Sequence, residues 1–266
     1  MKNYDVMKKQ ILILMLLLFS GILMAQKKTY TVGMLLDERT GKVDTLLVRL
    51  QKQVQAVVGE DATIIFSEEH IIESGYHLEK ARTAYDNLTN GEADIIMAFG
   101  AVNNKVIVER DTHETPTILF GSFNQDLVAE VFSKGLPAFE NLIFLVEPQS
   151  YRSDLIRLKA LSEFKKVGVV IEKQLLELLP LRESFDAVTT DLGVAYDFIP
   201  FEKPSDIIAG LDGFDAIYFA GGFTLTDTDV KNLANTLIEK KLPSFTLIGI
   251  DLVHLGLMAT NLPNTN

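Results

Sequence analysis

Two stretches of the chain carry residue types from which a binding site for a small molecule can be built. Stretch 93–121 and, about 120 residues later, stretch 214–249 share one order: Asp, an apolar run ending in Gly, a helical segment, Pro followed by Thr or Ser, and a second apolar run ending in Gly. Glycine lets backbone N–H groups approach a bound group closely. The repeat therefore predicts two similar edges at which backbone amides contact a ligand.

Polar, charged and aromatic residues follow the same predicted strand ends. Arg39 and Lys173 are candidate charge partners for a ligand, and Phe123 and Phe223 could stack on a flat one. Asn103 fits helix capping better than ligand contact. The candidate ligand-binding set is Asp37, Arg39, Gly100, Ala101, Asn103, Gly121, Ser122, Phe123, Glu172, Lys173, Gly221, Gly222, Phe223 and Asp251.

Catalytic chemistry finds little support in the sequence. The absence of cysteine excludes thiol catalysis and zinc–thiolate sites, and neither GxGxxG nor GxSxG occurs where a nucleotide site or a nucleophile would need it. Gly41 and Lys42 lack the remaining residues of a phosphate-binding loop, so they read as a turn. We expect no enzyme activity and no cofactor.

A metal site is also not expected. His70 and His77 lie near Glu68, Glu69 and Glu73, but the intervening Ser-Gly breaks the helix that would align both rings. The cluster is typical of a solvated loop.

The surrounding sequence alternates apolar runs of strand length with amphipathic helical segments. Strands that are apolar at every position must be buried on both faces, which is typical of parallel sheets covered by helices. The predicted strands are 31–36, 62–66, 93–99, 115–120, 141–146, 166–171, 194–199, 214–220 and 244–250.

The fold class is therefore α/β. One sheet of nine strands is an alternative, but the repeat favours two doubly wound, Rossmann-like lobes with parallel sheets, at 29–146 and 149–251. A tail or return segment would occupy 252–266. Since ligands of open parallel sheets bind at the carboxyl ends of the strands, two facing lobes would enclose a small molecule.

The first 25 residues have the features of a secretory signal. Lysines precede an apolar segment of 14 residues, 11–24, and Ala25 offers a small residue for cleavage. Leu23 is large for its position relative to the cut, so an uncleaved membrane anchor is the alternative. Without cysteine the mature protein is not a lipoprotein.

Removal of this segment takes away three Lys and one Asp, which changes the formal net charge from −11 to −13. Such a surface repels nucleic acid and anionic lipid. We therefore expect a periplasmic protein that binds no nucleic acid and has no stable membrane insertion after cleavage.

The order TVGMLLD, ADIIMAFGA, TPTILFGS, NLIFLVEP, KKVGVVIE, FDAIYFAGG and LPSFTLIG resembles that of the type I periplasmic substrate-binding proteins of ABC transporters. The resemblance covers about 29–260. It implies a two-lobe fold, a small ligand such as an amino acid, and an ABC transporter permease as partner. The chain departs from the family at Ala101, where a Thr is common. It also ends soon after the ninth predicted strand, so we expect either that the second lobe lacks its final strand and helix or that the sequence stops short of the C-terminal segment that returns to the first lobe.

The resulting functional hypothesis is an extracytoplasmic solute-binding protein of an ABC transport system. The alternative is a non-transporting accessory or sensor protein of a cell-envelope complex, with a degenerate ligand site. An exported α/β enzyme is the weakest hypothesis, because no nucleophile, base and orienting group can be assembled from these residues.

Overall fold

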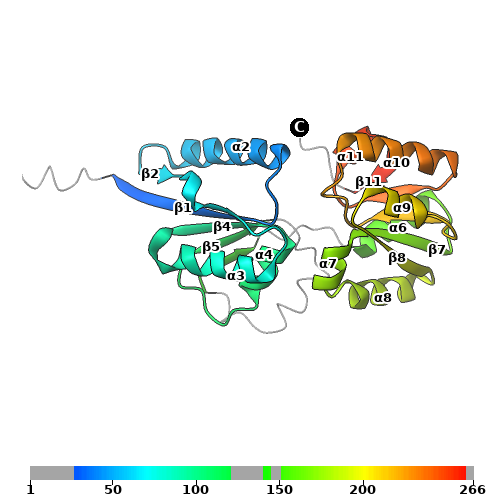
Figure 1. Cartoon of the computed structure of the whole chain (residues 1–266), viewed down its shortest axis with the longest axis horizontal. Helices are drawn as coiled ribbons and strands as arrows, with labels where there is room; N and C mark the ends of the chain where they lie inside the picture. The colour runs from blue at the N-terminus through cyan, green and yellow to red at the C-terminus, as the bar shows by residue number, and fades with distance from the viewer. Residues whose placement is uncertain (1–26, 121–139, 145–150, 262–266) are drawn as a thin grey trace, which may run out of the picture.

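Eleven strands of the described chain form two separate parallel sheets, so the alternative of one nine-stranded sheet is wrong (Figure 1). The computed structural model describes residues 27–120, 140–144 and 151–261. The predicted signal segment 1–25, the joint at 145–150 and the residues Gly121, Ser122 and Phe123 lie outside the described residues.

The first sheet has the order β2-β1-β4-β5-β6, with β3 also paired to β1. Its strands are β1 (Lys28–Leu36), β2 (Ala62–Ile65), β3 (Ile71–Glu73), β4 (Ile95–Phe99), β5 (Thr117–Phe120) and β6 (Leu142–Phe144). Its helices are α2 (Gly41–Val58), α3 (Leu78–Asn87) and α4 (Ala101–Val108), with short helical turns at Glu68–His70 and Leu88–Glu92.

The second sheet has the order β8-β7-β9-β10-β11, read from its other edge. Its strands are β7 (Lys166–Glu172), β8 (Ala195–Phe201), β9 (Ala216–Phe219), β10 (Ser244–Thr246) and β11 (Ala259–Thr260). Its helices are α6 (Tyr151–Leu161), α7 (Lys173–Leu178), α8 (Leu181–Leu192), α9 (Pro204–Ala209), α10 (Asp227–Glu239) and α11 (Ile250–His254). Each sheet thus orders its five main strands 2-1-3-4-5 along the chain.

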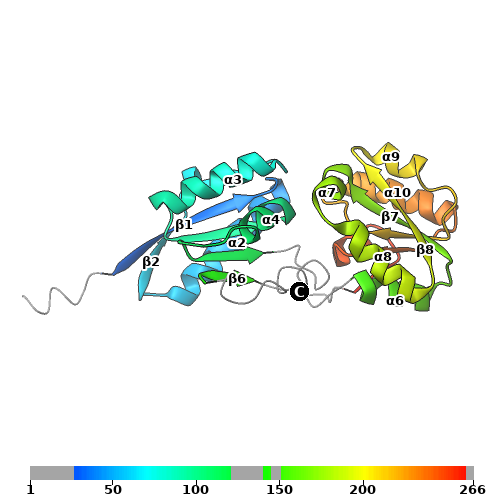
Figure 2. The ribbon, with the colours of Figure 1, turned by 90° about the horizontal axis from the view of Figure 1, so that it is seen from below.

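Successive side chains of a strand point to opposite faces of the sheet, so a strand that is apolar throughout has two faces to bury. Helices cover both faces of each sheet. In β1, Met34 packs on the α2 side and Leu35 on the side of α3 and α4. In β9, Tyr218 packs toward α6 and α8, whereas Ile217 packs toward α10. Figure 2 shows both layered lobes from a second direction.

The repeated Asp of the sequence aligns neighbouring strands at their amino ends. Asp94, just before β4, accepts a hydrogen bond from Thr31 N at 2.7 Å. Asp215, just before β9, accepts one from Lys166 N at 2.9 Å. The repeated Pro has an equivalent structural role, since the carbonyls of the two prolines before β5 and β10 each accept a backbone hydrogen bond at 2.9 Å from the adjacent strand.

Two predicted features of the second lobe need correction. The strand predicted over 244–250 ends at Thr246, whose Oγ1 accepts a hydrogen bond from Ile248 N at 3.0 Å and so turns the chain. No strand is predicted after 244–250, but a final strand is present as β11 beside β10. Its two residues are too short a signal to be recognised by pattern.

The two lobes share one apolar cluster. Ala81 of α3 and Val102 and Val106 of α4 belong to the same buried group as Leu175 of α7 and the core of the second lobe. Tyr76 and Ala101 pack against this group. The lobes therefore contact each other through α4 and α7.

Candidate functional site

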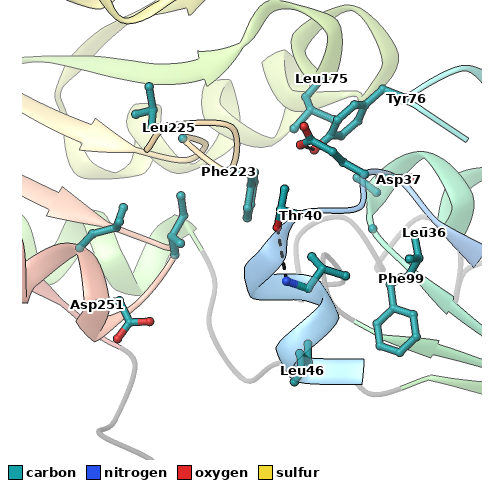
Figure 3. A pocket seen from close by; sticks show the side chains of 17 residues that line it. Leu36, Asp37, Thr40, Leu46, Tyr76, Phe99, Leu175, Phe223, Leu225 and Asp251 are labelled. Carbon is teal, nitrogen blue, oxygen red and sulfur yellow. Dashed lines mark hydrogen bonds between the residues drawn. The ribbon is translucent and has the colours of Figure 1, made fainter. Parts of the chain in front are cut away.

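A cavity of about 460 Å³ lies between the lobes, beside the α4–α7 contact. Its wall combines the carboxyl ends of β1, β4 and β9 with the first turn of α2 and the start of α11. Figure 3 shows Asp37, Thr40 and Tyr76 contributed by the first lobe, and Phe223, Leu225 and Asp251 by the second. The lining residues are Leu36, Asp37, Glu38, Thr40, Val43, Leu46, Tyr76, Phe99, Gly100, Ala101, Leu175, Gly222, Phe223, Leu225, Ile248, Asp251 and Leu252.

Asp37 follows β1 and caps the amino end of α4. Its carboxylate accepts hydrogen bonds from Val102 N at 2.9 Å and Asn103 N at 3.0 Å, and the side chain is buried. These are two of the N–H groups that a helix start leaves without a partner inside the helix. A Cβ at Gly100 would lie 2.3 Å from Asp37 Oδ2, so this glycine makes room for the carboxylate.

Glu172 repeats this arrangement at the end of β7. Its Oε1 accepts hydrogen bonds from Gly222 N at 2.9 Å and Thr224 N at 3.3 Å. A Cβ at Gly221 would lie 2.1 Å from Glu172 Oε2. The two repeated glycines therefore accommodate the protein's own carboxylates, a role different from the close ligand approach expected from the sequence.

Burial controls the ionisation of both carboxyl groups. Burial raises the pKa of Asp37 to about 6, against the opposing effect of the backbone hydrogen bonds from Val102 and Asn103. Burial likewise raises the pKa of Glu172, against the hydrogen bond from Gly222 N. Desolvation of a charge outweighs the N–H donors in both lobes.

Tyr76 lies where three carboxylates of the two lobes come close together. Its hydroxyl donates a hydrogen bond to Glu38 Oε2 at 3.3 Å. Burial, followed by the charges of Glu38, Asp37 and Glu172, raises the pKa of Tyr76 well above its usual range. The phenol therefore stays protonated and faces a negative environment.

The α2 helix begins at the cavity wall, where Thr40 is its N-cap residue. Thr40 Oγ1 accepts a hydrogen bond from Val43 N at 3.3 Å, as the dashed line in Figure 3 marks. This capping places Val43 and Leu46 along the wall, one turn apart on the same helix face. Thr40 is thus the N-cap residue of α2.

The two cationic candidates are held in ion pairs on the surface. Arg39 Nε lies 2.6 Å from Asp44 Oδ1, and its guanidinium also pairs with Glu68. Lys173 Nζ lies 2.8 Å from Glu202 Oε1. Neither residue lines the cavity.

The structure brings part of the predicted set together at the cavity. Asn103 does not line it: its Nδ2 donates to Phe99 O at 2.9 Å, so the side chain ties α4 to β4 and does not cap the helix. Glu172 and Gly221 form the buried layer behind the wall. The predicted residues that line the cavity are Asp37, Gly100, Ala101, Gly222, Phe223 and Asp251.

Sequence reasoning missed the apolar part of the wall. Leu175, Leu225 and Ile248 lie two to six residues after strand ends of the second sheet, and Tyr76 precedes α3. Their positions just after the strands could have indicated that they line the cavity, but apolar residues at these positions are equally typical of an ordinary hydrophobic core. Phe223 was recognised, and its side chain is 48% exposed in the wall.

The described residues contain neither a cluster of metal ligands nor a helix that could span a membrane. No group of three or more His, Cys, Asp or Glu side chains in the described ranges is placed to hold a metal ion. None of the helices described here has both the length and the apolarity needed to cross a bilayer.

The comparisons with known proteins show similarity of structure only. No family model and no curated protein matches the sequence. The ABC domain in complex with L-Trp from Streptococcus pneumonia superimposes with a TM-score of 0.63 at 15% identity, covering 89% of this chain and 80% of that one.

Two further solved structures are similar over most of the chain. A conserved domain protein from Vibrio cholerae has a TM-score of 0.66 at 14% identity, covering 88% of this chain and 78% of that one. A branched-chain amino acid ABC transporter protein from Thermus thermophilus with bound valine has a TM-score of 0.60 at 12% identity, covering 86% and 62%.

The two sheets and the cavity between them define an α/β protein with the type I periplasmic binding protein-like fold, as the sequence resemblance predicted. Proteins that share this fold with the chain include ABC substrate-binding proteins, LacI-type regulators and extracellular ligand-binding receptors. These neighbours are binding proteins.

Proposed function

We propose that this protein is an extracytoplasmic solute-binding protein of an ABC transport system, which holds a small molecule between its lobes and delivers it to a permease. The cavity carries the proposal, because both sheets contribute the carboxyl ends of strands to one wall. Its volume of about 460 Å³ falls within the range of small-molecule sites. The basic and apolar segment 1–25 supports export as a signal peptide.

Ligand contact with both lobes provides a physical basis for signalling to a permease. A ligand that bridges Tyr76 on one side and Phe223 on the other favours whichever lobe arrangement lets it touch both. A permease that recognises this arrangement would distinguish the loaded from the empty protein. The protein itself catalyses no reaction in this proposal.

Thermal unfolding of the mature protein against a panel of amines, amino acids, nucleosides, sugars and fatty acids tests the proposal. A specific ligand at 100 times its Kd is expected to stabilise the protein by about 2.7 kcal/mol, since it binds only the folded state. A rise in Tm with at least one compound, confirmed by calorimetry, supports a solute-binding role. No stabilisation across the panel contradicts it.

A second candidate, an accessory or sensor protein of an envelope complex, is favoured by one observation. The strand-end backbone amides that could hold a carboxylate of a ligand are already taken by Asp37 and Glu172. The accessory role predicts no Tm shift across the panel, together with recovery of the same envelope protein after crosslinking in intact cells.

Replacing Phe223 with Ala is expected to weaken binding of a panel ligand about tenfold, because an aromatic contact contributes roughly 0.5–1.5 kcal/mol beyond the area it buries. The side chain is 48% exposed, so the unliganded protein should unfold at nearly the same urea concentration. Isothermal titration calorimetry measures the affinity.

The matched control for Phe223→Ala is Ile238→Ala, which removes a side chain that is 66% exposed on α10 and lies outside the cavity. This variant should bind the ligand like the unchanged protein. Equal affinity of the Phe223 variant and the control would place the ligand elsewhere.

A further inference from the structure

The charged side chains in the cavity wall are all acidic within the described part of the chain. Asp37 and Glu38 line it from the first lobe and Asp251 from the second, and no described Lys, Arg or His side chain joins them. Behind the wall, Glu172 Oε2 is buried and has no hydrogen-bond partner among the described residues. The cavity therefore has a negative potential contributed by both lobes.

The cationic residues that neighbour these carboxylates in the sequence are paired with other acidic groups. Arg39, two residues after Asp37, is bound to Asp44 and Glu68 on the outer side. Lys173, next to Glu172, is paired with Glu202. An anionic ligand entering the cavity would have to break one of these pairs to gain a cationic partner.

The backbone amides that follow β4 and β9 are not available to an anion either. The N–H groups of Val102 and Asn103 at the start of α4 donate to Asp37. Those of Gly222 and Thr224 donate to Glu172. In each lobe, one set of N–H donors at a strand end is thus filled by a carboxylate of the protein.

The rest of the wall suits an apolar body with a positive end. Tyr76, Phe99 and Phe223 contribute aromatic surface, and ring faces attract cations. The aliphatic lining residues are Leu36, Val43, Leu46, Leu175, Leu225, Ile248 and Leu252. Tyr76 donates to Glu38, so its hydroxyl oxygen remains free to accept a hydrogen bond from an ammonium group.

We propose that the cavity selects cationic ligands with an apolar or aromatic body, such as arylalkyl amines, and rejects ligands that carry a carboxylate. The inference rests on the proposed solute-binding function and specifies its substrate class. It follows from three acidic groups in the wall, the paired state of Arg39 and Lys173, and the two filled amide sites.

Two matched ligand series test the proposal. Tryptamine, tryptophan and indole-3-propionate share one ring and differ in charge, as do phenethylamine, phenylalanine and 3-phenylpropanoate. The protein contains no Trp, so the fluorescence of the indole ligands reports binding without background. At pH 7.5 we expect at least one amine to bind at least tenfold more tightly than its amino acid, with no saturable binding of the deaminated acids.

Two variants assign the preference to the wall. Asp251→Asn and Glu38→Gln are isosteric and each removes one negative charge, so each should weaken amine binding about three- to tenfold. Added salt should weaken binding less in the variants than in the unchanged protein. Glu183→Gln on α8, outside the cavity, is the matched control and should leave the affinity unchanged.

The outcomes separate this inference from the proposed function. Tight binding of any carboxylate-bearing or anionic panel compound, or amine binding insensitive to both wall variants, would overturn the cationic preference while leaving a solute-binding role intact. Failure of both amines to bind also overturns it. Absence of stabilisation by every panel compound would instead remove the solute-binding function itself.

Discussion

Replacing Gly100 with Ala is expected to lower the free energy of unfolding by about 3–4 kcal/mol, because two costs combine. The residue has φ 100° and ψ 164°, a backbone conformation that is essentially restricted to glycine. The new Cβ would also lie 2.3 Å from Asp37 Oδ2 and 2.7 Å from Asp37 Cβ. Urea unfolding followed by far-UV circular dichroism measures the change.

Gly91→Ala separates the two costs. Gly91 also has a positive φ, with φ 108° and ψ 8°, and a Cβ there would meet nothing within 4 Å. This control should therefore lose only the conformational part, about 1–2 kcal/mol. If both variants lost the same free energy, the packing of Asp37 against Gly100 would have no energetic importance.

Deprotonation of the buried Asp37 is expected to make the protein lose stability as pH rises from about 4 to about 6. The pKa is raised from 3.8 to about 6 in the folded protein, so the folded state holds a proton that the unfolded state has released over this window. The free energy of unfolding then falls by about 3 kcal/mol across the window. Above about pH 6 the contribution of Asp37 no longer changes with pH.

Asp37→Asn removes this titration and provides the comparison. The difference in free energy of unfolding between the unchanged protein and the variant should shrink or change sign as pH rises through the window, because other carboxyl groups contribute equally to both. The measurement is urea unfolding at half-unit pH steps. A difference that is constant with pH would show that burial does not perturb the ionisation of Asp37.

Much of the fold could be predicted from the sequence, because its strands are apolar enough to be recognised without tertiary information. The prediction 166–171 corresponds to β7 (Lys166–Glu172), and the helix period after the first strand corresponds to α2 (Gly41–Val58). Two doubly wound sheets follow from the alternation and the repeat. Short elements such as β11 (Ala259–Thr260) depend on pairing with a neighbour and leave no pattern of their own.

The site was harder to predict because its main contacts join residues far apart in the chain. Asp37 was recognised as a strand-end residue, but its N–H donors lie 65 and 66 residues away. Glu172 and its donors are separated by 50 and 52 residues. Gly100 and Gly221 were correctly singled out, but the carboxylates that lie beside them are known only from the tertiary structure.

The apolar cluster shared by α4 and α7 constrains how this protein can move. Separating Val102 and Val106 from Leu175 would expose buried hydrocarbon to water, at about 25 cal/mol for each Å². A rotation that keeps this contact as a pivot avoids that cost. It moves α2 relative to α11, because these two helices lie at one edge of their lobes and α4 and α7 lie toward the opposite edge (Figure 1). Such a rotation would move Leu46 of α2, which lines the cavity, and would thereby change the access of a solute to the cavity.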